Sequence, residues 1–183
     1  MGAQYPAGTG NLVMSYLLEH AFVDIPVQQV FIRPAYYYSN WLGFGEIARE
    51  TGVLPSFLPV NLKIPMTAPP DVAGFIASVL MDRKTESGTL EIAGPSWYSP
   101  SDVARVFGNL FHKPVTAHQI PPEQWKESLL NAGFSENASD NLILMTQAVI
   151  DRKARPELPD EKVIRLHTSL EYFLSGKPEN SHD

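Results

Sequence analysis

The sequence predicts an α/β fold with parallel strands, and three observations support this. Apolar residues recur at helical spacing between residues 11 and 23. A β-branched stretch, residues 27–32, follows Pro26, and a helix that leads into a strand is half of a parallel α/β unit. Residues 90–95 then alternate and stop at Gly94-Pro95, as a short strand does. Two convincing strands are too few for an independent doubly wound sheet, so the domain is expected to be incomplete.

The first helix is expected to be well buried. Its apolar stripe consists of Leu12, Tyr16, Leu17 and Ala21, widened by Val13, Leu18 and Phe22. After the strand, Arg33-Pro34 is expected to take the chain out of regular pairing, because proline has no N–H and restricts the residue before it. A short helix over residues 44–50 follows, and Gly52 closes it.

Prolines divide the next segment, residues 53–65, into short extended pieces. Pro69-Pro70-Asp71 then begins a helix whose last turn is expected to be basic through Arg83 and Lys84. One face of this helix should be buried, and it consists of Val72, Phe75, Ile76, Val79 and Leu80.

Helix caps define the remaining third of the chain. Ser99 is expected to cap a helix with Pro100 in its first turn and Asp102 at its third position. An edge strand over residues 114–120 precedes a helix over residues 122–132, which Gly133 ends with Phe134 as the hydrophobic partner of the cap. Two more helices are expected at residues 139–152 and at about residues 160–174, before a flexible tail over residues 175–183.

Composition excludes several classes of function. The 183 residues carry a net charge of −6 with no basic cluster, which argues against DNA or RNA as a direct ligand. There is no cysteine, so disulfides, cysteine zinc sites and thiol nucleophiles are excluded. The length of 183 residues predicts one domain. No apolar run is long enough to span a membrane and no signal peptide begins the chain, which predicts a soluble cytoplasmic protein without a membrane partner.

Motifs for independent chemistry are weak. Gly8-Thr9-Gly10 precedes a helix but is not G-x-G-x-x-G and follows no strand, so a plain turn is favoured over phosphate binding. The five histidines have no helical metal-ligand spacing, which predicts no metal site, and there is no G-x-S-x-G elbow of a hydrolase. Asp71 is interpreted as a helix-start residue.

Residues 33–41 are the most informative stretch. A strand that ends at proline and opens into four aromatic residues and an asparagine is how the edge of an α/β sheet builds a ligand crevice. The alternative is that these aromatic residues only pack a loop against the core. For Arg33, a structural pair with a carboxylate is favoured over an anionic ligand.

Taken together, an ordered series of motifs resembles the NmrA-like family of atypical short-chain dehydrogenase/reductase proteins. The motifs are Gly8-Thr9-Gly10-Asn11, Glu19, Phe31 to Tyr36, Asn40, Leu62 to Met66 with Asp71-Val72-Ala73, Leu90 to Pro95, and Tyr98-Ser99-Pro100. The resemblance runs from the first residues to about Leu174 and covers the second half of the family's length or somewhat more.

The resemblance implies a specific fold and cofactor. In this family the N-terminal half is a Rossmann unit whose glycine-rich loop holds NADP(H) or NAD(H), and the C-terminal half completes the sheet and builds the substrate crevice. Residues 1–174 would then be the C-terminal portion of a Rossmann-like fold, lacking the N-terminal dinucleotide-binding βαβ units and carrying a mostly helical substrate-side subdomain. The choice between NAD and NADP would be made in the absent half.

Site residues follow from the same resemblance. Pro34, Ala35 and Tyr36 match the loop whose backbone lies beside the nicotinamide, and the pocket wall is matched by Tyr37, Tyr38, Asn40 and Trp41. The position of the family's active-site lysine falls on Met14, and Tyr16 has His20 instead of lysine four residues on. A methionine cannot act as a cation on a hydroxyl, so no catalytic residue is assigned and enzymatic activity is left open.

Two main hypotheses result. In the first, the chain is part of an NAD(P)-binding protein that acts as a cofactor-sensing regulator or weak NAD(P)H-dependent oxidoreductase on an unidentified small molecule once joined to its Rossmann half. In the second, it is a non-enzymatic interaction module or oligomerising pseudo-enzyme without nucleotide binding, whose free sheet edge is covered by another copy or by the missing N-terminal chain. A lone substrate-binding domain is a third, weaker reading.

Overall fold

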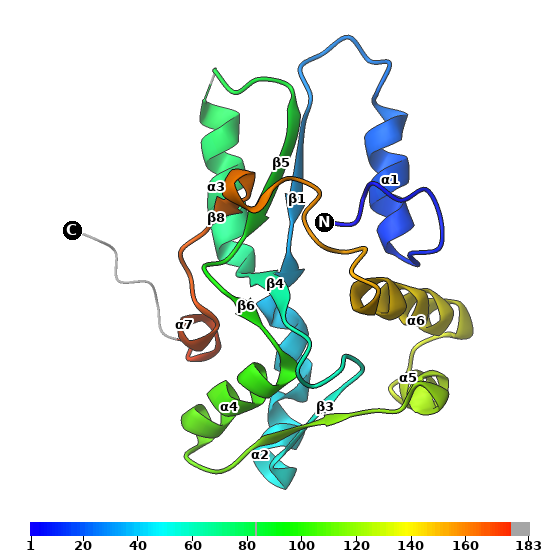
Figure 1. Ribbon diagram of the computed structural model, residues 1–183, viewed down its shortest axis with the longest axis vertical. Coiled ribbons are helices and arrows are strands. Elements are labelled where there is room, and N and C mark those ends of the chain that lie inside the picture. Colours follow the sequence, from blue (N-terminus) through cyan, green and yellow to red (C-terminus); the bar gives the residue numbers. More distant parts are fainter. Residues whose placement is uncertain (83, 177–183) are drawn as a thin grey trace, which may run out of the picture.

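The computed structural model describes residues 1–82 and 84–176. Its principal sheet is parallel throughout, with the strand order β1-β5-β8. The strands are β1 (Val30–Pro34), β5 (Gly88–Ala93) and β8 (Ile164–Arg165). Figure 1 shows β1 and β5 side by side in the upper half of the molecule, between α1 and α3.

Two smaller sheets continue from the carboxyl end of this one. In the first, β2 (Tyr36–Tyr37) pairs parallel with β4 (Ile64–Thr67), which pairs antiparallel with β6 (Trp97–Tyr98). In the second, β3 (Val53–Ser56) pairs parallel with β7 (Thr116–Gln119), as expected for a strand at an edge.

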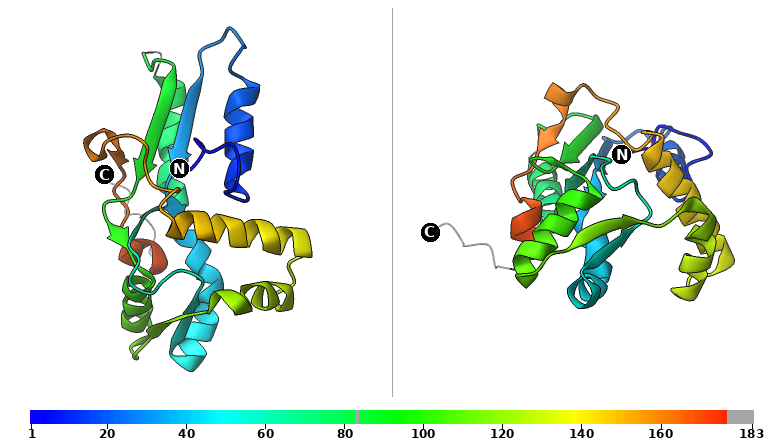
Figure 2. Two further views of the ribbon diagram at one scale, coloured as in Figure 1. Left: turned by 45° about the vertical axis from the view of Figure 1, so that its right-hand side comes forward. Right: turned by 60° about the horizontal axis from the view of Figure 1, so that its bottom comes forward.

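Seven α-helices surround these sheets in the described part of the chain. They are α1 (Leu12–Ala21), α2 (Gly45–Thr51), α3 (Pro69–Met81), α4 (Pro100–Phe111), α5 (Trp125–Asn131), α6 (Glu136–Ile150) and α7 (Leu170–Leu174). Three 3₁₀ helices join them: η1 (Tyr38–Phe44), η2 (Pro122–Gln124) and η3 (Asp160–Lys162). Figure 2 shows α5 and α6 projecting as a pair from the side of the molecule.

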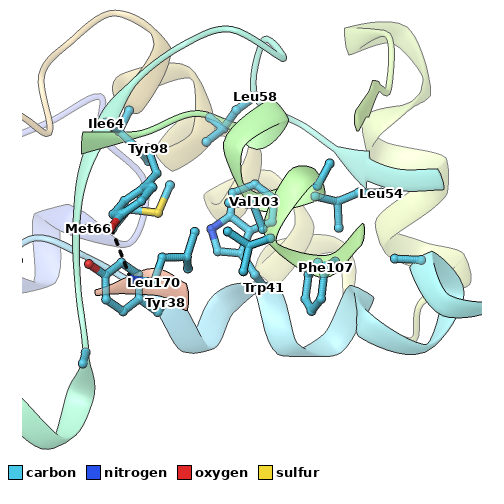
Figure 3. Packing of buried hydrophobic residues seen from close by; sticks show 14 residues of the cluster. Tyr38, Trp41, Leu54, Leu58, Ile64, Met66, Tyr98, Val103, Phe107 and Leu170 are labelled. Carbon is cyan, nitrogen blue, oxygen red and sulfur yellow. Dashed lines mark hydrogen bonds between the residues drawn. The ribbon is translucent and has the colours of Figure 1, made fainter. Parts of the chain in front are cut away.

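The main hydrophobic core lies in the lower half, where η1, α2, α4 and α7 meet the two small sheets. Tyr38 and Leu54 are fully buried there, and Trp41 and Phe107 nearly so. Figure 3 shows their side chains pointing toward one another, with Tyr98 and Leu170 joined by a hydrogen bond from the Leu170 N–H to the Tyr98 hydroxyl, 3.3 Å long. A smaller cluster of Val72, Ile92 and Leu166 holds α3 against one face of the principal sheet.

Local capping signals are confirmed. Ser99 and Asp102 form a complete capping box at the start of α4. Gly52 ends α2 with a left-handed φ of 73°. Gly133 adopts a φ of 89° after α5, and Phe134 donates its N–H to the Leu129 carbonyl 3.1 Å away, which closes the helix end.

The expectation that the first helix is well buried is wrong. In the described residues α1 buries none of its side chains, and Met14, Leu17 and Leu18 are 66%, 51% and 60% exposed. The periodicity predicts the helix correctly, but the described residues place no second layer over its apolar face.

Three other expectations also need correction. Arg33 and Pro34 do not leave the sheet, because they pair with Glu91 and Ile92 of β5 and a parallel edge strand tolerates a proline. The apolar face of α3 is buried mainly at Val72, whereas Leu80 is 81% exposed. The helix also ends at Met81, so Lys84 lies beyond it, and Arg83 is outside the described residues.

The predicted last helix is wrong over most of its length. Residues 160–174 form η3, β8 and α7 in succession. The Leu166 N–H donates to the Ala93 carbonyl over 2.7 Å, so pairing with β5 replaces helical hydrogen bonds in this segment. The rest of the predicted flexible tail, residues 177–183, lies outside the described residues. The assignment of residues 1–174 to one domain stays a prediction.

Candidate functional site

A cavity of about 490 Å³ lies between the segment that follows β1 and the projecting helices α5 and α6. Tyr36, Asn40 and Trp41 line it from one side. Ser128 of α5 and Met145 of α6 line it from the other. The structure thus brings three of the seven sequence-predicted site residues together at one concave surface.

Backbone pairing places Tyr36 at this cavity. The Ala35 N–H donates to the Ile92 carbonyl at 2.9 Å, which keeps the chain on β5 immediately after Pro34. Tyr36 then pairs with Met66 of β4. The cavity therefore begins directly beyond the carboxyl end of β1, the edge at which open α/β sheets bind their ligands.

The end of α5 supplies an aromatic wall. The turn at Gly133 brings Phe134 back toward the cavity, which it lines together with Leu129 and Leu142. Phe134 therefore serves the helix cap through its backbone N–H and the cavity through its side chain, which is still 44% exposed. The sequence predicts this cap but not that Phe134 lines the cavity, because Phe134 is far along the chain from Trp41 on the opposite wall.

Tyr36 is a neutral hydroxyl at this site. Burial raises its pKa to about 12, and a hydrogen bond from Asn40 offsets this only in part. A neutral phenol can donate a hydrogen bond to an acceptor on a ligand.

Two of the predicted pocket residues lie elsewhere. Tyr38 is fully buried in the main core, with its ring 5.8 Å from that of Tyr98 and 5.7 Å from that of Phe173. Tyr37 packs beside the cluster of Val72, Ile92 and Leu166. Neither is among the described residues that line the cavity.

The loop predicted to lie beside a nicotinamide has few free backbone groups. Ala35 is 4% exposed with its N–H bound to Ile92, and the Pro34 carbonyl accepts from the Met1 amino group at 2.8 Å. Burial lowers the pKa of that amino group to about 6, although Glu91 acts in the opposite direction.

Arg33 takes part in a structural ion pair, as favoured from the sequence. Its guanidinium binds both carboxylate oxygens of Glu19, at 2.8 and 2.7 Å, and Glu157 at 2.7 Å. Hydrogen bonds to Glu19 raise its pKa despite burial. The Arg33 guanidinium is therefore already paired with carboxylates of the protein.

Gly8-Thr9-Gly10 packs against α6. A Cβ on Gly10 would stand 1.9 Å from the Asn141 carbonyl oxygen, and Thr9 is fully buried. Close packing explains Gly10, whereas a Cβ on Gly8 would meet nothing within 4 Å, and Gly8 has a left-handed φ of 74°. Beyond them, Met14 is exposed on α1, and His20 stacks on Tyr16 with ring centroids 3.8 Å apart.

One further glycine pattern escaped the sequence reasoning. Gly43-Phe44-Gly45-Glu46-Ile47-Ala48 matches G-x-G-x-x-A at the start of α2. It follows η1 and not a strand, so it lacks the context of a dinucleotide-binding turn. No group of histidine, aspartate and glutamate side chains that could hold a metal ion occurs among residues 1–82 and 84–176.

Comparison with known proteins identifies the family. The family model described as NmrA-like matches residues 18–170. The chain belongs to the NmrA-like family. A curated relative, prestalk A differentiation protein A of Dictyostelium discoideum, is 26% identical over 129 residues, which are 69% of this chain and 42% of that protein.

Solved structures share the fold of this NmrA-like chain. NADPH-dependent quinone oxidoreductase QOR2 of Escherichia coli aligns with a TM-score of 0.77 at 19% identity, over 91% of this chain and 60% of the other. A Staphylococcus aureus nucleoside-diphosphate-sugar epimerase gives 0.74 at 13% identity, over 95% and 62%. Triphenylmethane reductase of Citrobacter sp., solved with NADP(H), gives 0.71 at 19% identity, over 89% and 58%.

The NmrA-like chain thus spans less than two thirds of these relatives. At the loop after β1, the Arg33 guanidinium is paired with carboxylates and the Ala35 N–H is bound to the Ile92 carbonyl. No helix in the described part is long and apolar enough to cross a membrane.

Proposed function

We propose that this chain is the substrate-binding part of an NAD(P)H-dependent oxidoreductase and that a dinucleotide-binding part continues its principal sheet beyond β1. The observation that carries the proposal is the position of the cavity, directly beyond the carboxyl end of a parallel strand. NADPH or NADH would supply a hydride when bound. In this chain Tyr36 and Asn40 would orient the substrate, and α5 and α6 would exclude water from it.

The open edge of β1 supports the second half of the proposal. Gln29 and Ala35 exchange hydrogen bonds with β5, so the intervening Val30 and Ile32 direct their backbone groups to the other edge, where the described residues place no strand. Figure 1 shows α1 on the side of β1 away from β5, and Leu17 and Leu18 of this helix are exposed. A further parallel strand with its helices would cover both.

A fusion tests this proposal. The dinucleotide-binding part of the E. coli quinone oxidoreductase would be joined ahead of Met1, and NADPH binding would be measured by thermal unfolding of the fusion, of the E. coli part and of the 183-residue chain. We expect millimolar NADPH to stabilise the fusion and to leave the chain by itself unchanged. A folded fusion that binds no NADPH, or a chain that binds it unaided, contradicts the proposal.

A second candidate function is a non-enzymatic interaction module. The exposed apolar side chains of α1 favour it, because such a patch beside a free strand edge marks an association site. The oligomeric state of the 183-residue chain, measured by sedimentation, distinguishes the two candidate functions. A stable dimer that also fails to bind nucleotide as the fusion would support the module.

A further inference from the structure

The amino end of the principal sheet carries an apolar surface that none of the described residues covers. At this end α1 leads into β1 and α3 leads into β5, and Figure 1 shows both junctions in the uppermost part of the molecule. The candidate cavity lies beyond the opposite, carboxyl end of β1. This apolar surface is therefore separate from the candidate site.

Hydrogen bonds hold the two junctions side by side. The Gln28 side-chain amide donates to the Thr85 carbonyl, and the Gln29 N–H donates to the Ser87 hydroxyl at 3.1 Å. The Gly88 N–H donates to the Gln29 carbonyl at 2.9 Å, where the ladder between β1 and β5 begins. Apolar side chains on the two junctions thus belong to one end of the sheet.

The amino-end patch consists of six large apolar side chains, each between 42% and 81% exposed. They are Phe22, Val23, Ile25, Val27, Leu80 and Met81. Together they expose roughly 400–500 Å² of apolar surface. A contiguous patch of this size is typical of a surface that binds a partner.

The composition of α3 indicates the same. Residues 72–81 contain no aspartate, glutamate, lysine or arginine. Val72 packs against the principal sheet, whereas Met81, half a turn away around the helix axis, is 78% exposed. A helix at a protein surface normally places charged residues on its outer face. The end of α3 therefore has the composition of a helix that is covered on both sides.

The dinucleotide-binding part proposed above would leave this patch open. It would extend the sheet from the edge of β1 that faces away from β5, whereas α3 packs on Ile92 of β5. A membrane is disfavoured by charge. Residues 22–29 carry only Asp24, and residues 82–87 carry two acidic and two basic residues, so the patch has no positive excess for anionic lipids.

A second copy of the chain matches the patch in area and in charge. A stable interface buries about 800 Å² per partner, of which roughly 56–65% is non-polar, so each partner contributes about 450–520 Å² of apolar surface. The six side chains of the amino-end patch supply nearly all of this. Charges of both signs at the rim allow the patch to meet itself without strong repulsion.

We propose that two copies of this chain associate through their amino-end patches around a twofold axis. In a twofold interface the same surface is used by both copies, so the junction of α1 and β1 in one copy faces the end of α3 in the other. Both cavities and both free edges of β1 then point away from the interface. The inference does not depend on the proposed function.

Sedimentation of the 183-residue chain between about 1 and 100 μM tests the proposal. We expect a monomer–dimer equilibrium with a Kd in the micromolar range or tighter. Leu80→Glu buries an unpaired charge in the interface and should weaken the dimer at least about tenfold. Leu18→Glu is the matched control, because Leu18 is 60% exposed on α1 but outside the patch, and should change the Kd by no more than about twofold. A chain that stays monomeric throughout overturns the proposal.

A second substitution tests the twofold arrangement. Val23→Glu lies on the other junction, where Val23 is 66% exposed, and should weaken the dimer as strongly as Leu80→Glu because the two junctions face each other. Both positions are exposed, so unchanged circular dichroism is expected in both variants. A dimer that Leu80→Glu weakens and Val23→Glu leaves intact contradicts the twofold interface.

Two further outcomes identify a different partner. A monomer that floats with neutral phosphatidylcholine vesicles would show that the patch inserts into lipid, which overturns the proposal. A dimer that is lost in Leu18→Glu and kept in Leu80→Glu would belong to α1 and the edge of β1, which supports the interaction module and overturns this interface. NADPH binding by the fusion is measured separately, so failure of the reductase proposal leaves the amino-end interface standing, and the converse holds.

Discussion

The two halves of this molecule use similar side chains in opposite ways. In the lower half, Tyr38, Leu54 and Val103 are fully buried where η1, α4 and the small sheets meet. In the upper half, Leu18 of α1, Val27 before β1 and Leu80 of α3 are 60%, 62% and 81% exposed. Apolar periodicity predicts helices in both, but burial also requires a packing partner, which the described residues do not provide for the apolar side chains of α1 or for Leu80 of α3.

The largest contrast is expected from deleting one side chain in each half. Tyr38→Ala removes a fully buried ring packed on Tyr98 and Phe173, and should lower the free energy of unfolding by about 3–5 kcal/mol. Leu18→Ala is the control on α1, with a change within about 0.5 kcal/mol. Urea denaturation measures both. A comparable loss in Leu18→Ala would show that α1 is covered in solution.

The N-terminal loop offers a sharper comparison between neighbouring glycines. Gly10→Ala would place a Cβ 1.9 Å from the Asn141 carbonyl oxygen at a φ of +55°. We expect it to cost about 3 kcal/mol, because backbone on both sides must move. Gly8→Ala shares a positive φ but meets nothing within 4 Å, and should cost about 1 kcal/mol. Equal thermal shifts in the two variants would mean that the loop does not pack on α6.

A buried carboxylate holds β5 to the segment before η3. Glu91 is fully buried and accepts the N–H groups of Glu157 and Leu158 at 3.0 and 2.8 Å. Glu91→Gln leaves one of these donors facing an amide NH₂, and we expect a loss of about 2 kcal/mol. Glu161→Gln, at an exposed position, is the matched control. No difference between the two in urea would disprove the role of Glu91.

The smallest effect concerns the capping box of α4. Burial would raise the pKa of Asp102, but hydrogen bonds from the Ser99 N–H and hydroxyl, with Lys63 nearby, lower it overall. Such a group stabilises the fold above its unfolded pKa of about 3.9, and this contribution is lost as the pH falls through the lower folded value. Asp102→Asn should therefore cost about 1 kcal/mol at neutral pH and progressively less below pH about 4. A cost independent of pH would exclude the charge as its origin.

Local chemistry explains what could be predicted from the sequence. Ser99, Gly52 and Gly133 act on hydrogen bonds within a few residues along the chain. The start of α4 and the ends of α2 and α5 therefore lie where these capping residues predict them. The segment over residues 160–174 was mispredicted because its partner, β5, is distant in sequence. For the candidate site, the aromatic stretch contains three residues that line the cavity, Tyr36, Asn40 and Trp41. Tyr38 and Trp41 both belong to the main core, and only packing shows that Trp41 also reaches the cavity.

The pairing of distant strands also has a kinetic consequence. Val30 pairs with Gly88 and Val53 with Thr116, so each of these two pairings closes a loop of roughly 60 residues. Chains dominated by such non-local pairing fold slowly. During that interval the edge of β1 and the bare face of α1 are available to other chains. Refolding yield should accordingly fall as protein concentration rises, even where the native state is stable.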